Sequence, residues 1–277
     1  MRPQFDPTGW VHWPDHEELS TEFMRLLGAA QEGGSTVSEC FLTASRIDPN
    51  DHESWFREWK KTADASVARA ERAIARGNLL SAQSNWLRAT NYYNAAIFAF
   101  DCTDSRWQAV LASMRACASR YLKHRKPAGT AVEIPWLKGY PLQGYLLPAP
   151  NSASEAPVLV CIGQPGHRKE EYLYKVSRYA ADRGITLLAV DLLGSGSGAQ
   201  FDNVVGRPEL ESAIGHVMDY LTSRDDVDKT RIAILGDGSS SFVARSIALD
   251  DRFAAAVCDG GISDVIQLTW ARPGSRG

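Results

Sequence analysis

The sequence has few cysteines, and their spacing does not suggest a metal site. Its five cysteines are far apart in the chain, and no two of them form a C-x-x-C pair. Zinc sites and disulfide frameworks need closely spaced or paired cysteines, so we expect reduced and mostly buried thiols. We therefore predict no metal, and with no phosphate-binding loop motif in the sequence we predict no cofactor of another kind.

Long apolar runs and clusters of basic residues are missing as well. The chain has 30 Lys and Arg against 33 Asp and Glu, a net charge of −3, and its basic residues are dispersed. This balance gives no electrostatic reason to expect a nucleic-acid partner. No apolar run approaches the length that spans a bilayer, and the first residues lack the apolar core of a signal peptide. We expect a cytoplasmic protein without a membrane partner.

The chain changes character near Lys126-Pro-Ala-Gly129. Before this point apolar residues recur at helical spacing. We predict an all-helical domain over residues 1–128 and a second domain over residues 129–277. Asn50 or Asp51 is expected to cap a helix. The helices are expected over residues 17–30, from about 51 to 76, over 80–100 and over about 105–122.

Aromatic residues follow one face of these predicted helices. Trp55 and Trp59 are four positions apart, and Trp86 and Tyr93 are seven positions apart. Such stripes can line a ligand cavity, but at helical spacing they more often form the core between helices. We favour the core interpretation.

After Gly129 short apolar runs alternate with helical segments. The pattern predicts an antiparallel strand pair at 131–137 and 142–147, buried strands at 158–162, 186–190, 232–235 and 254–258, and helices at 170–183, 208–224 and 242–249. Continuous apolar strands that alternate with helices are typical of a mostly parallel α/β sheet. Ligands of such sheets bind beyond the carboxyl ends of the strands, so the loops there are the candidate site.

The most informative of these loops joins a strand to a helix over residues 231–242. An α/β-hydrolase holds its nucleophile in such a turn, at the serine of a G-x-S-x-G motif. Counted from Gly236, that position is Gly238, which has no side chain to attack a substrate. We favour a vacant nucleophile position. A shifted register that presents Ser239 or Ser240 stays open, although Phe242 then stands where the motif has its last glycine.

The same serines have a simpler interpretation. Serine hydroxyls at the start of a helix commonly cap its backbone N–H groups, and this alone explains Ser239, Ser240 and Ser241.

The loop after the strand at 158–162 is Gly163-Gln-Pro-Gly-His-Arg-Lys-Glu170. Backbone groups of Gly163, Gln164 and Ser239 are candidates for holding a substrate oxygen or an oxyanion. His167 is a candidate general base, but lone loop histidines are usually only solvated. The glycine run at 194–198 reads G-x-G-x-G rather than the dinucleotide fingerprint, so we expect a loop at the rim of the site there.

A serine hydrolase also needs an acid and a histidine that follow the nucleophile in the chain. After residue 242 the sequence holds Asp250, Asp251, Asp259 and Asp264 but no histidine, and Asp259 is interpreted as a turn residue. We expect that a standard triad is not assembled and that the core domain is incomplete at its C-terminus. An incomplete sheet exposes an edge strand, which favours a homodimer.

Several segments, taken in order, resemble one group of proteins. They are Glu53-Ser-Trp55 with Glu58-Trp59, Ala82 through Arg88-Ala-Thr-Asn-Tyr-Tyr93, Arg183-Gly-Ile-Thr-Leu-Leu-Ala-Val-Asp191, and Asp251-Arg-Phe-Ala-Ala-Ala-Val-Cys-Asp-Gly-Gly261. Over about residues 17–265 the chain resembles α/β-hydrolases with an N-terminal helical cap. This group includes 2,6-dihydroxypseudooxynicotine hydrolase, fungal polyketide chain-shortening hydrolases and fermentation–respiration switch proteins.

The resemblance implies serine-dependent cleavage of an ester, or of a C–C bond next to a carbonyl, in a pocket between cap and core. The chain departs from the group at Gly238, at Ser240 and Ser241, where glycines would follow, and in the missing later acid and histidine.

Two classes of function stay open. The chain is either a hydrolase of ketone-, ester- or polyketide-like small molecules, as in secondary metabolism, or a non-catalytic pseudohydrolase that binds a ligand or partner. The departures favour the second class, because loss of triad members costs orders of magnitude in rate. In both classes we expect a hydrophobic small molecule between cap and core.

Overall fold

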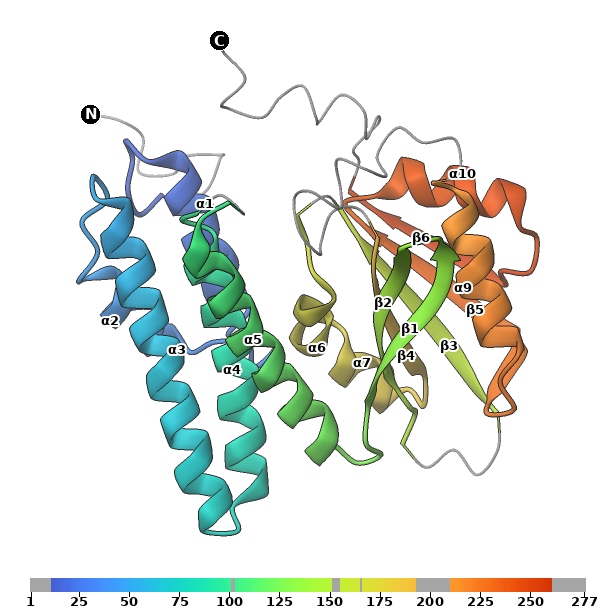
Figure 1. Ribbon diagram of the computed structural model, residues 1–277, viewed down its shortest axis with the longest axis horizontal. Helices are drawn as coiled ribbons and strands as arrows, with labels where there is room; N and C mark the ends of the chain where they lie inside the picture. Colours follow the sequence, from blue (N-terminus) through green and yellow to red (C-terminus); the bar gives the residue numbers. More distant parts are fainter. Residues whose placement is uncertain (1–10, 101–102, 151–154, 165, 193–209, 261–277) are drawn as a thin grey trace. The chain divides into compact units, whose positions relative to one another are not determined.

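The computed structural model of the protein describes residues 11–100, 103–150, 155–164, 166–192 and 210–260 (Figure 1). The chain forms two compact units, residues 1–121 and 122–277. Three sequence predictions fall outside the described residues. They concern the glycine run at 194–198, Asp264, and the start of the helix expected at 208–224.

The first unit is helical. Its helices are α1 (Glu17–Gly28), α2 (Val37–Ala44), α3 (His52–Ala75), α4 (Leu79–Ile97) and α5 (Ser105–His124). The predicted cap of α3 is confirmed, because the Asp51 carboxylate accepts a hydrogen bond from the backbone N–H of Glu53 at 3.0 Å. Helix α2 is missing from the sequence prediction. Its eight residues are too few to establish a periodicity, and only the capping residue Thr36 marks its start.

Aromatic side chains form the core of this unit. Trp55 and Trp59 are fully buried, and Trp86 is almost fully buried. The indole N–H of Trp55 donates to the backbone carbonyl of Ala95 at 2.8 Å, so the ring is both packed and hydrogen-bonded. The core interpretation of the aromatic stripes is confirmed.

The second unit is built on a sheet with six described strands. They are β1 (Thr130–Leu137), β2 (Tyr140–Leu147), β3 (Ala156–Gly163), β4 (Thr186–Asp191), β5 (Val227–Asp237) and β6 (Ala255–Asp259), in the order β1-β2-β4-β3-β5-β6. Strand β2 is antiparallel to both β1 and β4, while β4, β3, β5 and β6 are parallel. The predicted fold class, a helical region followed by a mostly parallel α/β sheet, is confirmed.

Helices cover both faces of this sheet. Figure 1 shows α9 (Ser212–Thr222) and α10 (Ser240–Leu249) on one face and α6 (Tyr172–Lys175) and α7 (Ser177–Asp182) on the other. Side chains of α9 and α10, among them Ile214, Val217 and Phe242, pack on strand residues such as Val160 and Ile234.

The prediction of one helix over residues 170–183 is wrong. The segment forms a 3₁₀ turn (Lys169–Glu171), α6 and α7, with a break at Val176, whose φ of −126° is not helical. The first turns are held by hydrogen bonds to the carboxyl edge of the sheet, while α7 packs along β4. One straight helix does not satisfy both sets of contacts.

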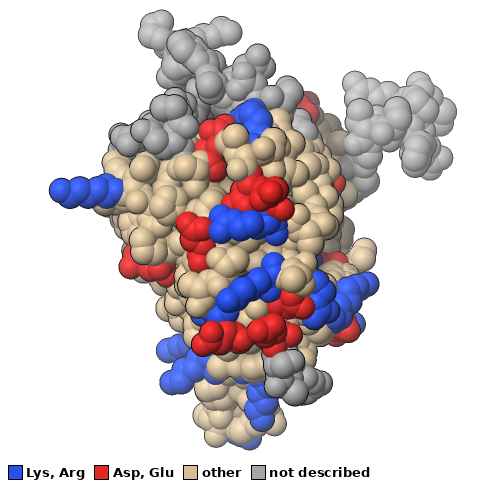
Figure 2. Space-filling view, turned by 90° about the vertical axis from the view of Figure 1, so that its right-hand side faces the viewer, with Lys and Arg blue, Asp and Glu red and all other residues tan. Residues whose placement is uncertain are grey.

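Charges of both signs are mixed on the surface. On the face drawn in Figure 2, Lys and Arg side chains alternate with Asp and Glu over the described residues. Ion pairs next to α9 and α10 are of this kind, with Arg245 of α10 at 3.1 Å from Glu211, which precedes α9, and Arg252, which follows α10, at 2.7 Å from Asp219 of α9. Among the described helices, none is long and apolar enough to cross a membrane.

Candidate ligand site at the carboxyl edge of the sheet

Strand β5 enters α10 through a tight turn with Gly238 at its apex. The φ of Gly238 is +71°, in the left-handed region that glycine adopts without strain. Its N–H donates to the backbone carbonyl of Asp259 at 2.7 Å, so the end of β6 lies against the turn. A strand, a strained turn and a helix are the elements that present the nucleophile in α/β-hydrolases.

A side chain at position 238 has no free space. A Cβ atom there would lie 2.4 Å from Oε1 of Gln164 and 3.0 Å from the Gln164 Cβ. The Gln164 side chain therefore occupies the space directly over the turn. The backbone N–H of Gln164 donates to the carbonyl of Asp237 at 2.8 Å and fixes the loop after β3 to the end of β5.

The hydroxyls of Ser239 and Ser240 both hydrogen-bond within the protein. Ser239 is buried, and its Oγ–H donates to the carbonyl of Ile162 at 2.9 Å. Ser240 donates to the carbonyl of Gly260. The prediction that Ser239 caps the helix is wrong, because its hydroxyl turns to β3 and makes no cap hydrogen bond. A nucleophilic role for either serine stays a prediction.

Asp237 gathers three side chains from the segment that follows β3. Its Oδ2 lies 3.2 Å from Nζ of Lys175, 3.3 Å from the hydroxyl of Tyr172 and 3.5 Å from Nδ1 of His167. Lys175 also pairs with Glu171 at 3.1 Å. We call Asp237, His167, Tyr172, Lys175 and Glu171 the Asp237 cluster.

Gly163, the last residue of β3, makes this gathering possible. A Cβ atom on Gly163 would lie 2.6 Å from the Cβ of His167 and 2.8 Å from the hydroxyl of Tyr172. Any side chain here would push both groups away from Asp237. The role in oxyanion binding that the sequence suggests for Gly163 and Gln164 stays a prediction.

The Asp237 cluster is charged at neutral pH. Burial alone would raise the pKa of Asp237, but the contact with His167 and the charge of Lys175 outweigh burial and hold that pKa well below its usual value. Burial likewise opposes the charge of Lys175, while Glu171 and Asp237 raise its pKa. Burial, and then the charge of Asp237, raises the pKa of Tyr172, which stays a neutral phenol.

The hydrogen bond between Gln164 and His167 orients both side chains. Nε2 of Gln164 lies 3.1 Å from Nε2 of His167. An amide nitrogen only donates, so the ring Nε2 accepts, and the proton of the neutral ring is on Nδ1, facing Asp237. The amide oxygen of Gln164 is then directed away from the ring.

The buried thiol at this edge is not a nucleophile, and the described residues form no metal site. Burial, with a smaller contribution from Asp237, raises the pKa of the fully buried Cys161 thiol, which keeps it protonated and unreactive. Within the described ranges no three His, Cys, Asp or Glu side chains are grouped so that they could hold a metal ion.

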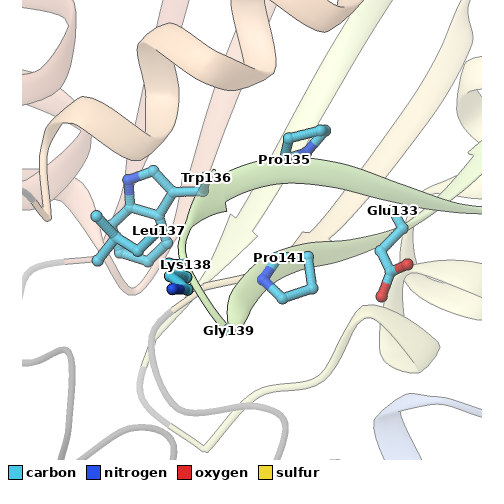
Figure 3. Close-up of a pocket in the computed structure, with 7 residues that line it drawn as sticks. All are labelled: Glu133, Pro135, Trp136, Leu137, Lys138, Gly139 and Pro141. Atoms are coloured by element: carbon cyan, nitrogen blue, oxygen red, sulfur yellow. The ribbon is translucent and has the colours of Figure 1, made fainter.

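A pocket of about 450 Å³ lies elsewhere in the second unit, at the β1–β2 hairpin (Figure 3). Trp136 stands at its side, and the indole N–H donates to the hydroxyl of Ser212 at 3.1 Å. The residues that line the pocket are Glu133, Pro135, Trp136, Leu137, Lys138, Gly139 and Pro141. None of these residues belongs to the loops after β3, β4 or β5, so this pocket is separate from the turn at Gly238.

A protein-family model described as "Esterase FrsA-like" matches residues 50–269. The chain belongs to the FrsA-like family. The match covers most of both units, so the family relationship includes the helical region as well as the sheet.

Among the curated relatives of the chain are fungal hydrolases. The chain is 32% identical over 262 residues to the 20-hydroxy-prefusarin hydrolase FUS2 of Gibberella moniliformis and 33% identical over 264 residues to the hydrolase LUC6 of a Fusarium species. Each alignment covers 91% of this chain and 62% of the relative. The chain thus spans about three fifths of the length of these relatives.

A solved structure shares the fold. The crystal structure of 2,6-dihydroxy-pseudo-oxynicotine hydrolase matches with a TM-score of 0.68 at 23% identity, over 82% of this chain and 62% of that one. At this identity the likeness concerns the fold alone.

The sequence points to the loops in which these residues lie, but it does not single out Asp237, Tyr172 or Lys175, and it favours a solvated loop residue at His167. One signal is present in the sequence, since Asp237 follows the predicted strand at 232–235 and His167 follows the predicted strand at 158–162. Strands β3 and β5 are parallel neighbours, and Gly163 pairs with Asp237, which brings the two ends together.

Proposed function

We propose that this FrsA-like chain binds a hydrophobic, ketone-, ester- or polyketide-like small molecule at the carboxyl edge of its sheet without using a serine nucleophile there. The observation that carries this proposal is Gly238 at the apex of the turn. It has no attacking atom, and the side chain of Gln164 lies in the space that a nucleophile's side chain needs.

The hydrogen bonds around the turn support the same proposal. The hydroxyl of Ser239 is buried against Ile162, and that of Ser240 is engaged by Gly260. The backbone N–H of Gln164, a candidate oxyanion donor, already donates to the carbonyl of Asp237. Acyl transfer needs both an activated nucleophile and free donors for the oxyanion.

A second candidate function is hydrolysis of an ester, or of a C–C bond next to a carbonyl. The pair of His167 and Asp237 favours it, because a histidine oriented by a carboxylate is the usual general base of hydrolytic enzymes. The fungal relatives, which are named hydrolases, favour it as well.

Turnover of p-nitrophenyl butyrate separates the two candidates. We expect no hydrolysis by the 277-residue chain above the buffer rate. Hydrolysis that is lost in the Ser239→Ala/Ser240→Ala double variant would contradict the proposal and establish the shifted register. Hydrolysis that persists in that variant but is lost in His167→Ala would establish the second candidate, with water as the attacking group.

We also propose that the protein is cytoplasmic, acts in secondary metabolism and forms a homodimer. The four cysteines in the described part of the chain are free, which supports the predicted location in a reducing cytoplasm. The named fungal relatives support a role in secondary metabolism. All five residues of β6 are exposed, which supports the predicted homodimer. Light scattering that finds only monomer would contradict the dimer.

A further inference from the structure

The side chain of Gln164 is held in place by a chain of polar contacts. The carboxylate of Asp237 faces Nδ1 of His167 at 3.5 Å, and Nε2 of His167 lies 3.1 Å from the amide nitrogen of Gln164. The other end of the amide, Oε1, lies where it would touch a Cβ atom on Gly238 at 2.4 Å. The series of contacts that runs from Asp237 through His167 to Gln164 therefore ends at the apex of the turn.

The carboxylate determines which end of the amide faces the turn. A negative charge opposite Nδ1 favours a proton on that nitrogen, so the neutral ring has its lone pair on Nε2. A lone pair accepts a hydrogen bond from the amide NH₂ and repels the amide oxygen. With the NH₂ directed to His167, the oxygen remains directed toward Gly238.

The charge of Lys175 helps to keep this carboxylate ionised. Nζ of Lys175 lies 3.2 Å from Oδ2 of Asp237, and the hydroxyl of Tyr172 donates to the same oxygen at 3.3 Å. The negative charge that faces His167 is therefore retained.

The apex of the turn consequently offers a hydrogen-bond acceptor. One backbone N–H group that could have served as a donor is already used, since that of Gln164 donates to the carbonyl of Asp237. An α/β-hydrolase presents donors at this place, because a carbonyl oxygen becomes negative there during acyl transfer. An amide oxygen favours the opposite kind of ligand group.

We propose that Gln164 is a specificity-determining residue that accepts a hydrogen bond from a hydroxyl of the ligand, so that the site selects phenols and enols over ketones and ethers. The inference rests on the proposed function, because it assumes that a hydrophobic molecule binds at this edge. His167 acts through Gln164 as a positioning residue.

A matched pair of probes tests this selection. 2-Naphthol and 2-methoxynaphthalene share an aromatic body, but only 2-naphthol can donate a hydrogen bond. We expect calorimetric titration of the full chain to show that 2-naphthol binds about tenfold more tightly, which is the scale of one hydrogen bond. This comparison uses the unaltered protein, so it does not depend on whether a variant folds.

Three variants assign the selection to Gln164. Gln164→Leu is expected to bring the affinity ratio of the two probes to about one, without weakening the methyl ether. His167→Phe is expected to lower the ratio as well, although Gln164 is intact, because the amide loses the partner that orients it. Gln143→Leu, at an exposed position of β2, is the control and should leave the ratio unchanged.

The outcomes separate this inference from the proposed function. Equal binding of both probes by the unaltered chain would overturn the role of Gln164 and leave the proposed function standing. Tighter binding of 2-acetylnaphthalene than of 2-naphthol would also overturn it, since a ketone needs a donor. If none of the probes binds, the proposed function fails, and this inference fails with it.

Discussion

Two aspartates that end the strands on either side of β3 each bind a lysine from the segment after β3, but the two pairs differ in exposure. Asp191 ends β4 and binds Lys169 with Oδ2 at 2.5 Å from Nζ, and the side chains are 7% and 4% exposed. Asp237 ends β5 and binds Lys175 at 3.2 Å, and both side chains are 27% exposed.

The difference in exposure separates a structural pair from a candidate ligand site. The backbone N–H of Lys169 also donates to Asp191 at 2.7 Å, and Nζ lies 3.3 Å from Glu170, which accepts a hydrogen bond from Tyr145. A buried ionic network of this kind fixes the loop to the sheet and has no surface left for a ligand. The Asp237 cluster holds the same loop more loosely and stays accessible next to Gly238.

The largest expected effect comes from breaking the buried pair. Lys169→Met leaves the carboxylate of Asp191 buried without the cation that it binds, so we expect the free energy of unfolding to fall by about 3–5 kcal/mol. Urea unfolding followed by circular dichroism measures it. Lys175→Met is the matched comparison and should cost less, since water can solvate Asp237, although the second partner of Lys175, Glu171, is buried. Equal losses would contradict the distinction between the two clusters.

The next effect concerns the crowding over the turn. Gly238→Ala should destabilise the protein by more than the about 1–2 kcal/mol that a left-handed φ costs an L-residue, because the new Cβ also meets Gln164. Gly184→Ala is the matched control, because Gly184 has a φ of +66° and an added Cβ would have no atom within 4 Å. It should cost only the free energy of the left-handed backbone conformation.

A double variant isolates the steric part of this effect. In Gly238→Ala/Gln164→Ala the contact with the amide is removed and only the 3.0 Å contact with the Cβ of residue 164 remains, so the loss should fall toward that of Gly184→Ala. Additive losses from the two substitutions would show that Gln164 does not fill the space over Gly238.

The third effect is a pH dependence. The pKa of Asp237 is depressed in the folded protein, so its contribution to stability is present above the unfolded pKa of about 4 and is lost as pH falls toward the folded pKa. Asp237→Asn should lower the free energy of unfolding by about 2 kcal/mol at pH 7, and by progressively less below pH 4. Denaturation at a series of pH values measures it, and a difference independent of pH would contradict this assignment.

The smallest effect distinguishes the two serines. Ser239→Ala removes a buried hydroxyl from the carbonyl of Ile162 and should cost about 1 kcal/mol. Ser240 is more accessible, so Ser240→Ala should cost less. Thermal unfolding gives both values. A larger loss in Ser240→Ala would mean that the hydroxyl of Ser240, and not that of Ser239, holds α10 against the sheet.

Particular residues show how far sequence reasoning reached. The alternation of apolar strands and helices predicted the sheet and its carboxyl edge, and Asp51 and the buried tryptophans were assigned correctly because caps and helix faces are local patterns. Helix α2 and the break at Val176 were missed, since a short helix has no measurable period and the break is imposed by contacts with Asp237.

The sequence by itself determined that position 238 has no side chain and that it lies in a turn between a strand and a helix. Only the tertiary structure decided what fills the space above that glycine. Gln164 and His167 follow β3, while Asp237 ends β5, more than 60 residues later. Parallel pairing of two strands joins these groups, and pairing between distant strands leaves no mark in local spacing.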